Sequence, residues 1–248
     1  MKFINRIITN RTVDLSDVNF SEGEIILIDK PSGPTSFQVV NKIKKITREM
    51  KIGHSGTLDP LASGLMIVCT GKKTKVMDNF FNLDKTYSGT IMLGVKSISM
   101  DSETEMIELP FNEHLDEKKI LCVREKFLGE IEQLPPMYSA VKINGKKLYN
   151  LARKGKSIER KSRKVFISNF EIEKIDMPYI HFRITCSKGT YIRVIADDFG
   201  KELHTGGILI KLRREKIGNF QVNDALTIPQ FESTLFNTAK FFEIVSKN

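Results

Sequence analysis

Residues 53–64 read Gly-His-Ser-Gly-Thr-Leu-Asp-Pro-Leu-Ala-Ser-Gly, and this stretch organises the expected fold of the 248-residue chain. Glycines, a proline and small polar residues of this kind mark a loop with defined turns. The loop holds one aspartate, Asp59, at a set place. An aspartate before a proline is common in turns, so these residues alone also fit an Asp59 that only caps a turn.

Apolar runs lie on both sides of this loop. Residues 24–28 and 65–70 have the composition of short buried strands. Between them, residues 30–34 predict a turn, and Thr35 or Ser36 can cap a helix that follows. Residues 52–64 as a whole are expected to be a loop.

The rest of the chain mixes helical and extended patterns. We expect strands at 86–93, 165–175 and 179–186, helices at 73–81, 114–128 and 190–203, irregular chain at 96–112, and an apolar stretch at 208–212. Because strands and helices do not alternate strictly, the prediction is an α+β (mixed α/β) fold. Its central sheet is expected to be mixed and largely antiparallel, flanked by helices and loops.

Composition limits the class of protein. Hydrophobic residues make up 40% and charged residues 28% of the chain, as in ordinary soluble proteins. No apolar run approaches the roughly 20 residues of a membrane helix, and the N-terminus lacks the pattern of a secretion signal. Cys69, Cys122 and Cys186 are far apart, and the four histidines are scattered. We therefore expect buried cysteines in a reducing compartment, and neither a disulfide framework nor a metal site.

The net charge of +9 is concentrated in one segment. Residues 142–164 contain ten basic residues against one acid, Glu159, so they carry a charge equal to that of the whole chain. The basic residues are Lys142, Lys146, Lys147, Arg153, Lys154, Lys156, Arg160, Lys161, Arg163 and Lys164. Such clustering suits binding of a polyanion. A solvated lysine-rich surface is the alternative, whereas a membrane surface is disfavoured because no apolar stripe accompanies the charge.

Two familiar motifs are rejected. Gly71-Lys72-Lys73-Thr74 resembles part of a phosphate-binding loop, but the upstream glycine has the wrong spacing and a second lysine displaces the threonine. His54, Ser55 and Asp59 are the residue types of a hydrolase triad. They crowd into one loop without a nucleophile elbow, whereas triad members normally come from separate parts of a fold.

Position by position, residues 53–64 resemble the catalytic motif of the TruB family of tRNA pseudouridine synthases. Other family motifs are matched in the same order along the chain, so that the resemblance covers about residues 24–228. The matching segments are Leu27 to Gly33, Asp84 to Tyr87, Pro136 to Lys142, Gly145 to Tyr149, Cys186 to Arg193, and Leu212 to Arg214. The resemblance implies the pseudouridine synthase catalytic fold.

The resemblance also implies a reaction and its catalytic residues. A uridine is flipped out of the RNA, its C–N glycosidic bond is broken, and a C–C bond to the same base is formed. Asp59 is the implied carboxylate, acting either as a nucleophile or as a base at the ribose. Both roles need an ionised Asp59, and Arg193 is expected to pair with it. Tyr87 is expected to pack on the flipped base and to assist proton removal. The reaction is redox-neutral, so no cofactor is expected.

Four further residues are implied in substrate binding. His54 is expected to help to hold the base-flipped RNA, and Tyr191 and Leu212 to form pocket walls that exclude water. Lys30 is expected to orient the loop or to neutralise charge. The substrate implied for this site is the T-arm stem-loop of tRNA, at the uridine usually numbered 55.

The resemblance gives the expected domain organisation. Residues 1–23 would be an N-terminal extension, and residues 24–228 the catalytic domain, with a basic RNA-gripping loop at about 134–164. Residues 229–248 would be a short tail, too short for the C-terminal PUA domain of many relatives. We expect a cytoplasmic monomer with no protein partner.

Two departures from the family pattern affect the expected RNA binding. Glu215 follows Leu212-Arg213-Arg214, where it could weaken RNA binding or orient an arginine, and residues 97–101 keep only part of the family's acidic loop. A tRNA-folding chaperone and a synthase acting on another RNA uridine stand as alternative functions.

Overall fold

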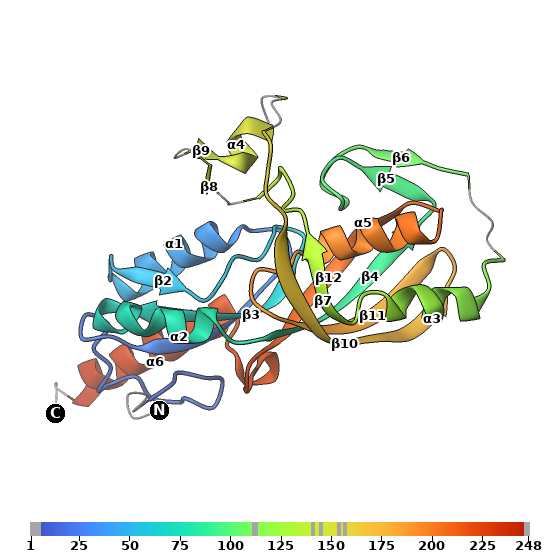
Figure 1. Ribbon diagram of the computed structural model, residues 1–248. Coiled ribbons are helices and arrows are strands. Elements are labelled where there is room, and N and C mark those ends of the chain that lie inside the picture. The colour runs from blue at the N-terminus through green and yellow to red at the C-terminus, as the bar shows by residue number, and fades with distance from the viewer. Residues whose placement is uncertain are drawn as a thin grey trace. The chain divides into compact units, whose positions relative to one another are not determined.

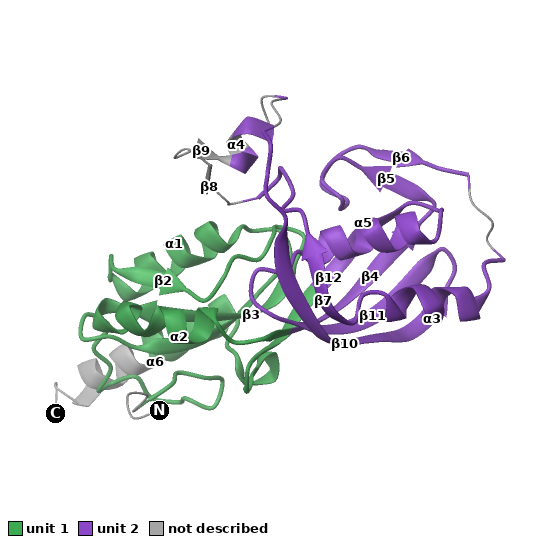
Figure 2. Ribbon diagram, in the orientation of Figure 1, with its two compact units in different colours: residues 1–85, 213–248 green, residues 86–212 purple. Residues whose placement is uncertain are grey.

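The computed structural model describes residues 6–110, 114–139, 142–143, 146–152, 155 and 158–245 (Figure 1). The chain divides into two compact units (Figure 2). Unit 1 comprises residues 1–85 and 213–248, and unit 2 comprises residues 86–212. Strand β12 (Gly207–Ile217) begins in unit 2 and ends in unit 1.

The sheet of unit 1 surrounds strand β3 (Ser63–Thr70). Strand β1 (Ile25–Lys30) runs antiparallel to β3, and the short strand β2 (Ile52–His54) is also antiparallel to it. The end of β12 pairs with β3 in parallel, with Arg213 opposite Ser63 and Arg214 opposite Gly64. Strand β13 (Phe220–Gln221) folds back on β12. The loop of residues 55–62 therefore leaves β2 and returns into β3.

Helices of unit 1 pack on this sheet. Helix α1 (Ser36–Thr47) begins at a capping box in which the Thr35 hydroxyl and the Gln38 side chain each bond to the other residue's backbone. Its apolar face buries Val39, Val40 and Ile43. The 3₁₀ helix η1 (Gly71–Val76) continues into α2 (Met77–Phe81), and η2 (Val222–Asp224) precedes α6 (Ile228–Val245).

The core of unit 1 combines β1, β3 and the segments around them. It contains nine buried residues: Ile25, Leu27, Leu65, Ile67, Cys69, Phe80, Ile217, Val222 and Ala225. Burial raises the pKa of the Cys69 thiol to about 12, so this cysteine stays protonated as a small apolar residue. Residues before the predicted start at 24 also reach the interior, since Ile8 is fully buried and bridges to Ile26.

The sheet of unit 2 has the strand order β12-β4-β11-β10-β7. Its strands are β4 (Lys85–Leu93), β11 (Tyr179–Cys186), β10 (Arg163–Asp176) and β7 (Gly129–Gln133). Strand β10 is antiparallel to both β11 and β7. Helix α3 (Glu117–Glu125) packs on β10 and on α5 (Ile192–Glu202), and Phe127, Phe170, Phe182 and Phe199 form an aromatic cluster in this core.

Small elements complete unit 2. Strands β5 (Val95–Ser97) and β6 (Met106–Glu108) form an antiparallel ribbon. Strands β8 (Lys142–Ile143) and β9 (Lys146–Lys147) form another, followed by helix α4 (Leu148–Ala152). Among the described residues, no helix is both long and apolar enough to cross a membrane.

The predicted mixed, largely antiparallel fold is confirmed, but several local predictions are wrong. Residues 52–54 form strand β2 because their backbone pairs with β3. The stretch expected to be irregular contains the β5–β6 ribbon, and Cys122 is exposed on α3. Strand β7 was not expected at all, because its alternating glutamates resemble a polar linker. These elements depend on pairing with distant chain, which local composition does not show.

Candidate active site

Lys30 lies at the end of β1, beneath the loop that carries Asp59. Its side chain is fully buried, and Nζ donates hydrogen bonds to the carbonyls of Ala62 at 2.5 Å and Pro31 at 3.0 Å. The Pro60 carbonyl is a further acceptor at 3.4 Å. An ammonium group has three donors, so one lysine can hold several carbonyls of a loop in place. This geometry gives Lys30 a role in orienting the loop backbone.

The residues on either side of Asp59 are held by the start of α1. The Ser36 hydroxyl donates to the Leu58 carbonyl at 2.9 Å and accepts from the Leu58 amide at 2.8 Å. The Gly33 amide donates to the Pro60 carbonyl at 2.8 Å. Asp59 is half-buried, and its own carbonyl accepts from the Ala62 amide at 3.0 Å. The backbone around Asp59 is thus fixed by contacts from residues distant in sequence.

Arg214 holds the two ends of the same loop. Its buried guanidinium donates to the Leu65 carbonyl at 2.7 Å through Nε and to the Gly56 carbonyl at 3.1 Å through Nη2. Gly64 passes close to Arg214 with φ of +107°, and a Cβ atom at Gly64 would lie 2.4 Å from the Arg214 carbonyl oxygen. Only glycine fits this approach without a shift of backbone. Sequence reasoning had named Arg214 only as part of the matching segment from Leu212 to Arg214.

Arg213, next to it on β12, faces the other direction. Its guanidinium makes a two-point contact with the Asp29 carboxylate, at 3.0 and 2.8 Å, and this hydrogen-bonded partner raises the pKa of Arg213. The Glu215 carboxylate lies 3.7 Å from Nε of Arg213. This position fits the predicted alternative in which Glu215 orients an arginine.

His54 ends strand β2, directly before the loop. Burial lowers the pKa of its imidazole; the Gly56 backbone opposes this with a smaller effect, and the charge of Arg214 adds slightly to the lowering. Its buried Nδ1 atom makes no hydrogen bond within the part of the chain that the structure describes. At neutral pH the ring is therefore uncharged, which suits contact with a base more than contact with a phosphate.

In unit 2, the predicted site residues lie on β4, α5 and β12. Tyr87 on β4 and Leu212 on β12 are buried, with 8% and 6% of their surface exposed. Tyr191 directly precedes α5. Its amide donates to Oε1 of Gln133 at 2.7 Å, and Nε2 of Gln133 donates to its carbonyl at 3.1 Å. The Arg163 guanidinium lies 4.6 Å from the centroid of the Tyr191 ring, a cation–π distance.

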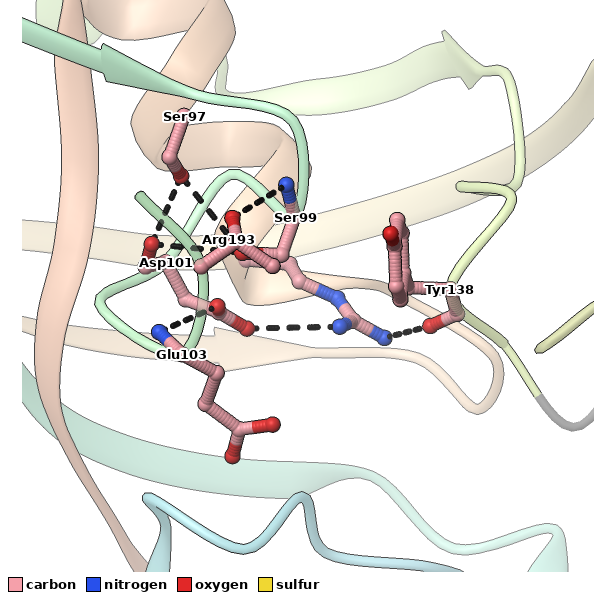
Figure 3. Close-up of polar contacts among 7 residues, drawn as sticks. Ser97, Ser99, Asp101, Glu103, Tyr138 and Arg193 are labelled. Carbon is pink, nitrogen blue, oxygen red and sulfur yellow. Dashed lines mark hydrogen bonds and ion pairs between the residues drawn. The ribbon is translucent and has the colours of Figure 1, made fainter. Parts of the chain in front are cut away.

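Arg193 forms a buried ion pair with Asp101 (Figure 3). Nη1 of Arg193 lies 3.3 Å from Oδ2 of Asp101, and the two side chains are 5% and 0% exposed. Nη2 of Arg193 donates to the Tyr138 carbonyl, while the Glu103 amide donates to Oδ1 of Asp101 at 3.0 Å. The predicted pairing of Arg193 with Asp59 joins residues of different units and stays a prediction.

Asp101 is a buried partner of Arg193 that sequence reasoning missed. The loop around it is closed by two serine hydroxyls: Ser97 donates to the Asp101 carbonyl at 2.6 Å, and Ser99 donates to it at 3.3 Å. The neighbouring Met100 has φ of +63°, and Asp101 bridges to Leu209 of β12. The only signal in the sequence was the partial acidic loop at residues 97–101. One acid in a polar stretch does not reveal that it will be buried.

No metal centre is formed by the described residues, in which no group of three or more His, Cys, Asp or Glu side chains could hold an ion. Unit 1 holds a carboxylate on a loop whose backbone is fixed, and unit 2 holds a buried arginine whose guanidinium lies 5.8 Å from the centroid of the Tyr191 ring. A carboxylate can act as a general base or as a nucleophile, and aromatic or apolar side chains can pack against a flat, uncharged ring.

Two solved structures contain a chain whose fold is similar to that of this protein. A chain in the crystal structure of a Cbf5-Nop10-Gar1 complex is 31% identical, with a TM-score of 0.68 over 88% of this chain. A chain of the archaeal box H/ACA sRNP Nop10-Cbf5 complex is 27% identical, with a TM-score of 0.64 over 89% of this chain. This chain covers 56% of each of those chains, so it spans about half their length.

The family follows from sequence. The model of the TruB family pseudouridylate synthase N-terminal domain matches residues 44–192. The chain therefore belongs to the TruB family of pseudouridylate synthases, as its motifs predicted.

Curated relatives named tRNA pseudouridine synthase B are similar over nearly their whole length. The protein of Flavobacterium johnsoniae is 48% identical over 87% of this chain and 97% of its own. That of Chloroherpeton thalassium is 47% identical over 88% of this chain and 93% of its own.

Proposed function

We propose that this protein isomerises one uridine of tRNA, in the T-arm loop at position 55, to pseudouridine. Membership of the TruB family and the names of the curated relatives support a tRNA substrate. The observation that carries the proposal furthest is the fixed loop around Asp59. Lys30, Ser36 and Arg214 hold its backbone from three different elements. Preorganisation of a single carboxylate to this degree is typical of a catalytic group.

Asp59 carries the chemistry in this proposal. The C–N bond between the ribose C1′ and N1 of the base breaks, the base rotates, and a C–C bond forms between C1′ and C5. Asp59 assists either by attacking the sugar as a nucleophile or by taking a proton from the ribose. The proton on C5 then leaves, and N1 gains one, so atoms and charge balance without a cofactor.

The other predicted residues would hold the flipped base and orient Asp59. Tyr87 packs on the base and assists the loss of the C5 proton, and Arg193 pairs with the Asp59 carboxylate. Tyr191 and Leu212 line the pocket, and neutral His54 holds the displaced RNA. The aromatic and apolar character of these side chains supports this assignment, because a base removed from its stack needs new flat contacts.

The basic segment at residues 142–164 is proposed to bind the phosphates of the T-arm. Three of its positively charged side chains contact other groups of unit 2. Arg163 lies over Tyr191, Arg160 donates to the Pro135 carbonyl at 2.9 Å, and Lys164 pairs with Glu130 at 2.8 Å. Several of its other cations, including Arg153, Lys154 and Lys156, lie outside the described residues. A cytoplasmic location, a monomeric state and the absence of a protein partner belong to the same proposal.

Pseudouridine mapping on an unmodified tRNA transcript tests this function. The transcript is incubated with the wild type, with Asp59→Ala and with Asp59→Asn. We expect product at one T-loop uridine with the wild type, and at least about 10³-fold slower conversion with either variant. Equal thermal unfolding of the three proteins controls for folding. Binding of tRNA by the wild type without conversion would support the tRNA-folding chaperone. Product at another uridine would support a synthase with a different target.

A further inference from the structure

Gln133 is a buried amide at a position of β7 where the strand pattern favours an apolar side chain. Glu130 and Glu132 are exposed, whereas the alternate residues Ile131 and Gln133 lie on the other face of the strand. Gln133 is only 1% exposed. A buried amide is unfavourable unless its oxygen and its nitrogen are both hydrogen-bonded. The partners of these two atoms therefore indicate what the residue does.

Both ends of the Gln133 amide bind the backbone of one residue, Tyr191. Oε1 of Gln133 accepts from the Tyr191 amide at 2.7 Å, and Nε2 donates to the Tyr191 carbonyl at 3.1 Å. Tyr191 is extended, with φ of −99° and ψ of 107°, and its own side chain makes no capping hydrogen bond at the start of α5. One side chain thus binds both backbone groups of this residue, as a neighbouring strand would. We call these two hydrogen bonds the Gln133 clamp.

Arg163 holds the ring of the same tyrosine. It lies opposite Gln133 in the register of β7 and β10. Its guanidinium lies 4.6 Å from the centroid of the Tyr191 ring and donates to the Gly189 carbonyl. Gly189 has φ of +82°, so it turns the chain between β11 and α5. Neighbouring residues of two strands therefore hold the backbone and the ring of Tyr191.

The clamp also reaches the first turn of α5, which carries Arg193. The Tyr191 carbonyl that Gln133 binds accepts from the Val194 amide at 3.1 Å and from the Ile195 amide at 3.2 Å. The guanidinium of Arg193 lies 5.8 Å from the centroid of the Tyr191 ring. A shift of the Tyr191 backbone would therefore move the ring and change its distance from Arg193.

We propose that Gln133 is a positioning residue for the isomerisation and acts through Tyr191. The clamp holds the Tyr191 ring in the orientation in which it contacts the flipped uridine, while Gln133 itself stays buried. This inference rests on the proposed function, in which Tyr191 lines the pocket. A misplacement of about 1 Å, caused by a change away from the reacting atoms, can slow an enzyme about 100-fold.

The first test measures the clamp without RNA. The chain has no tryptophan, so Tyr191→Trp introduces a single fluorescent reporter at this position. Its emission maximum and anisotropy are compared before and after addition of Gln133→Leu, which removes both hydrogen bonds. We expect lower anisotropy and emission at longer wavelength, because the indole is held less firmly and meets more water. Gln221→Leu is the matched control and should change neither quantity, since Gln221 is exposed on β13. Equal spectra after both changes would overturn the proposal, whether or not tRNA is converted.

The second test measures single-turnover conversion of tRNA, at a temperature where thermal unfolding curves show every variant folded. Gln133→Leu should slow conversion roughly 10- to 100-fold with an unchanged Kd for tRNA, and Gln221→Leu should match the wild type. In a Tyr191→Ala chain, Gln133→Leu should cause little further loss, because the two residues act together. The same fold loss in both chains would overturn the proposal, as would weaker tRNA binding at an unchanged conversion rate.

A second variant covers the case in which leucine at position 133 prevents folding. Gln133→Asn keeps an amide that is one methylene too short to reach Tyr191, so it should slow conversion as Gln133→Leu does. Conversion at the wild-type rate by a folded Gln133→Asn would contradict the positioning role. A wild type that converts no tRNA would refute the proposed function, and the indole spectra would still decide whether Gln133 holds Tyr191.

Discussion

The two units bury positively charged side chains with different kinds of partner. In unit 1, Lys30 and Arg214 donate to backbone carbonyls of the loop that carries Asp59. In unit 2, Arg193 faces the carboxylate of Asp101, which is itself fully buried. The first arrangement holds a backbone, and the second holds a side chain.

This difference has a physical consequence. Carbonyl acceptors let one buried cation hold several backbone groups at once, as Lys30 and Arg214 do for the Asp59 loop. A carboxylate cancels the charge and also fixes the plane of a guanidinium. The buried cations of unit 1 therefore position a loop backbone, whereas Asp101 in unit 2 fixes the orientation of the Arg193 guanidinium. Each arrangement can be broken separately.

The largest effect on stability is expected from Asp101→Asn. This change leaves the Arg193 charge buried without its carboxylate, and breaking such a pair costs about 3–5 kcal/mol. We expect a loss of this size in the free energy of unfolding, measured by urea denaturation. Asp101→Asn/Arg193→Gln removes both charges and should recover part of the loss. If the single variant lost less than about 1 kcal/mol, the pair would not stabilise unit 2.

A smaller effect is expected from Lys30→Met. Methionine keeps an unbranched apolar stem of similar length but lacks the ammonium group, so the Ala62 and Pro60 carbonyls lose a donor, at a cost of about 1–3 kcal/mol. The same variant should slow conversion of tRNA, because the Asp59 loop is less firmly held. Lys126→Met is the matched control, since Lys126 is exposed and its pair with Glu202 lies at the surface. Equal stability and activity of the two variants would contradict a loop-holding role for Lys30.

The smallest effect is a pH dependence from His54. Burial lowers the pKa of its imidazole in the folded state, so the unfolded chain binds a proton first as pH falls below about 6.5. The stabilisation is complete above that pH and is lost as pH falls towards the lowered folded pKa. We expect the wild type to lose more stability than His54→Gln between pH 7 and 5. Parallel curves of unfolding free energy against pH would show that His54 is not desolvated.

Much of the site was predictable from sequence, for local reasons. The Gly-rich loop, the helix after Thr35, and the strands at 65–70 and 179–186 follow from turn residues, a helix-capping residue and apolar runs. The matching motifs placed the chain in the TruB family, which the family model confirms. The assigned roles of Asp59, Tyr87 and Arg193, the domain boundaries and the absence of a PUA domain stay predictions.

Three features depended on tertiary structure. The burial of Asp101 against Arg193, the contact of Arg214 with both ends of the Asp59 loop, and the hydrogen bond from the Gly71 amide to the Lys51 carbonyl each bring together distant segments. Local patterns report which residues prefer a turn, a helix or a strand, because those preferences arise within a few residues. The partner of a buried charge is decided only when distant parts of the chain pack together.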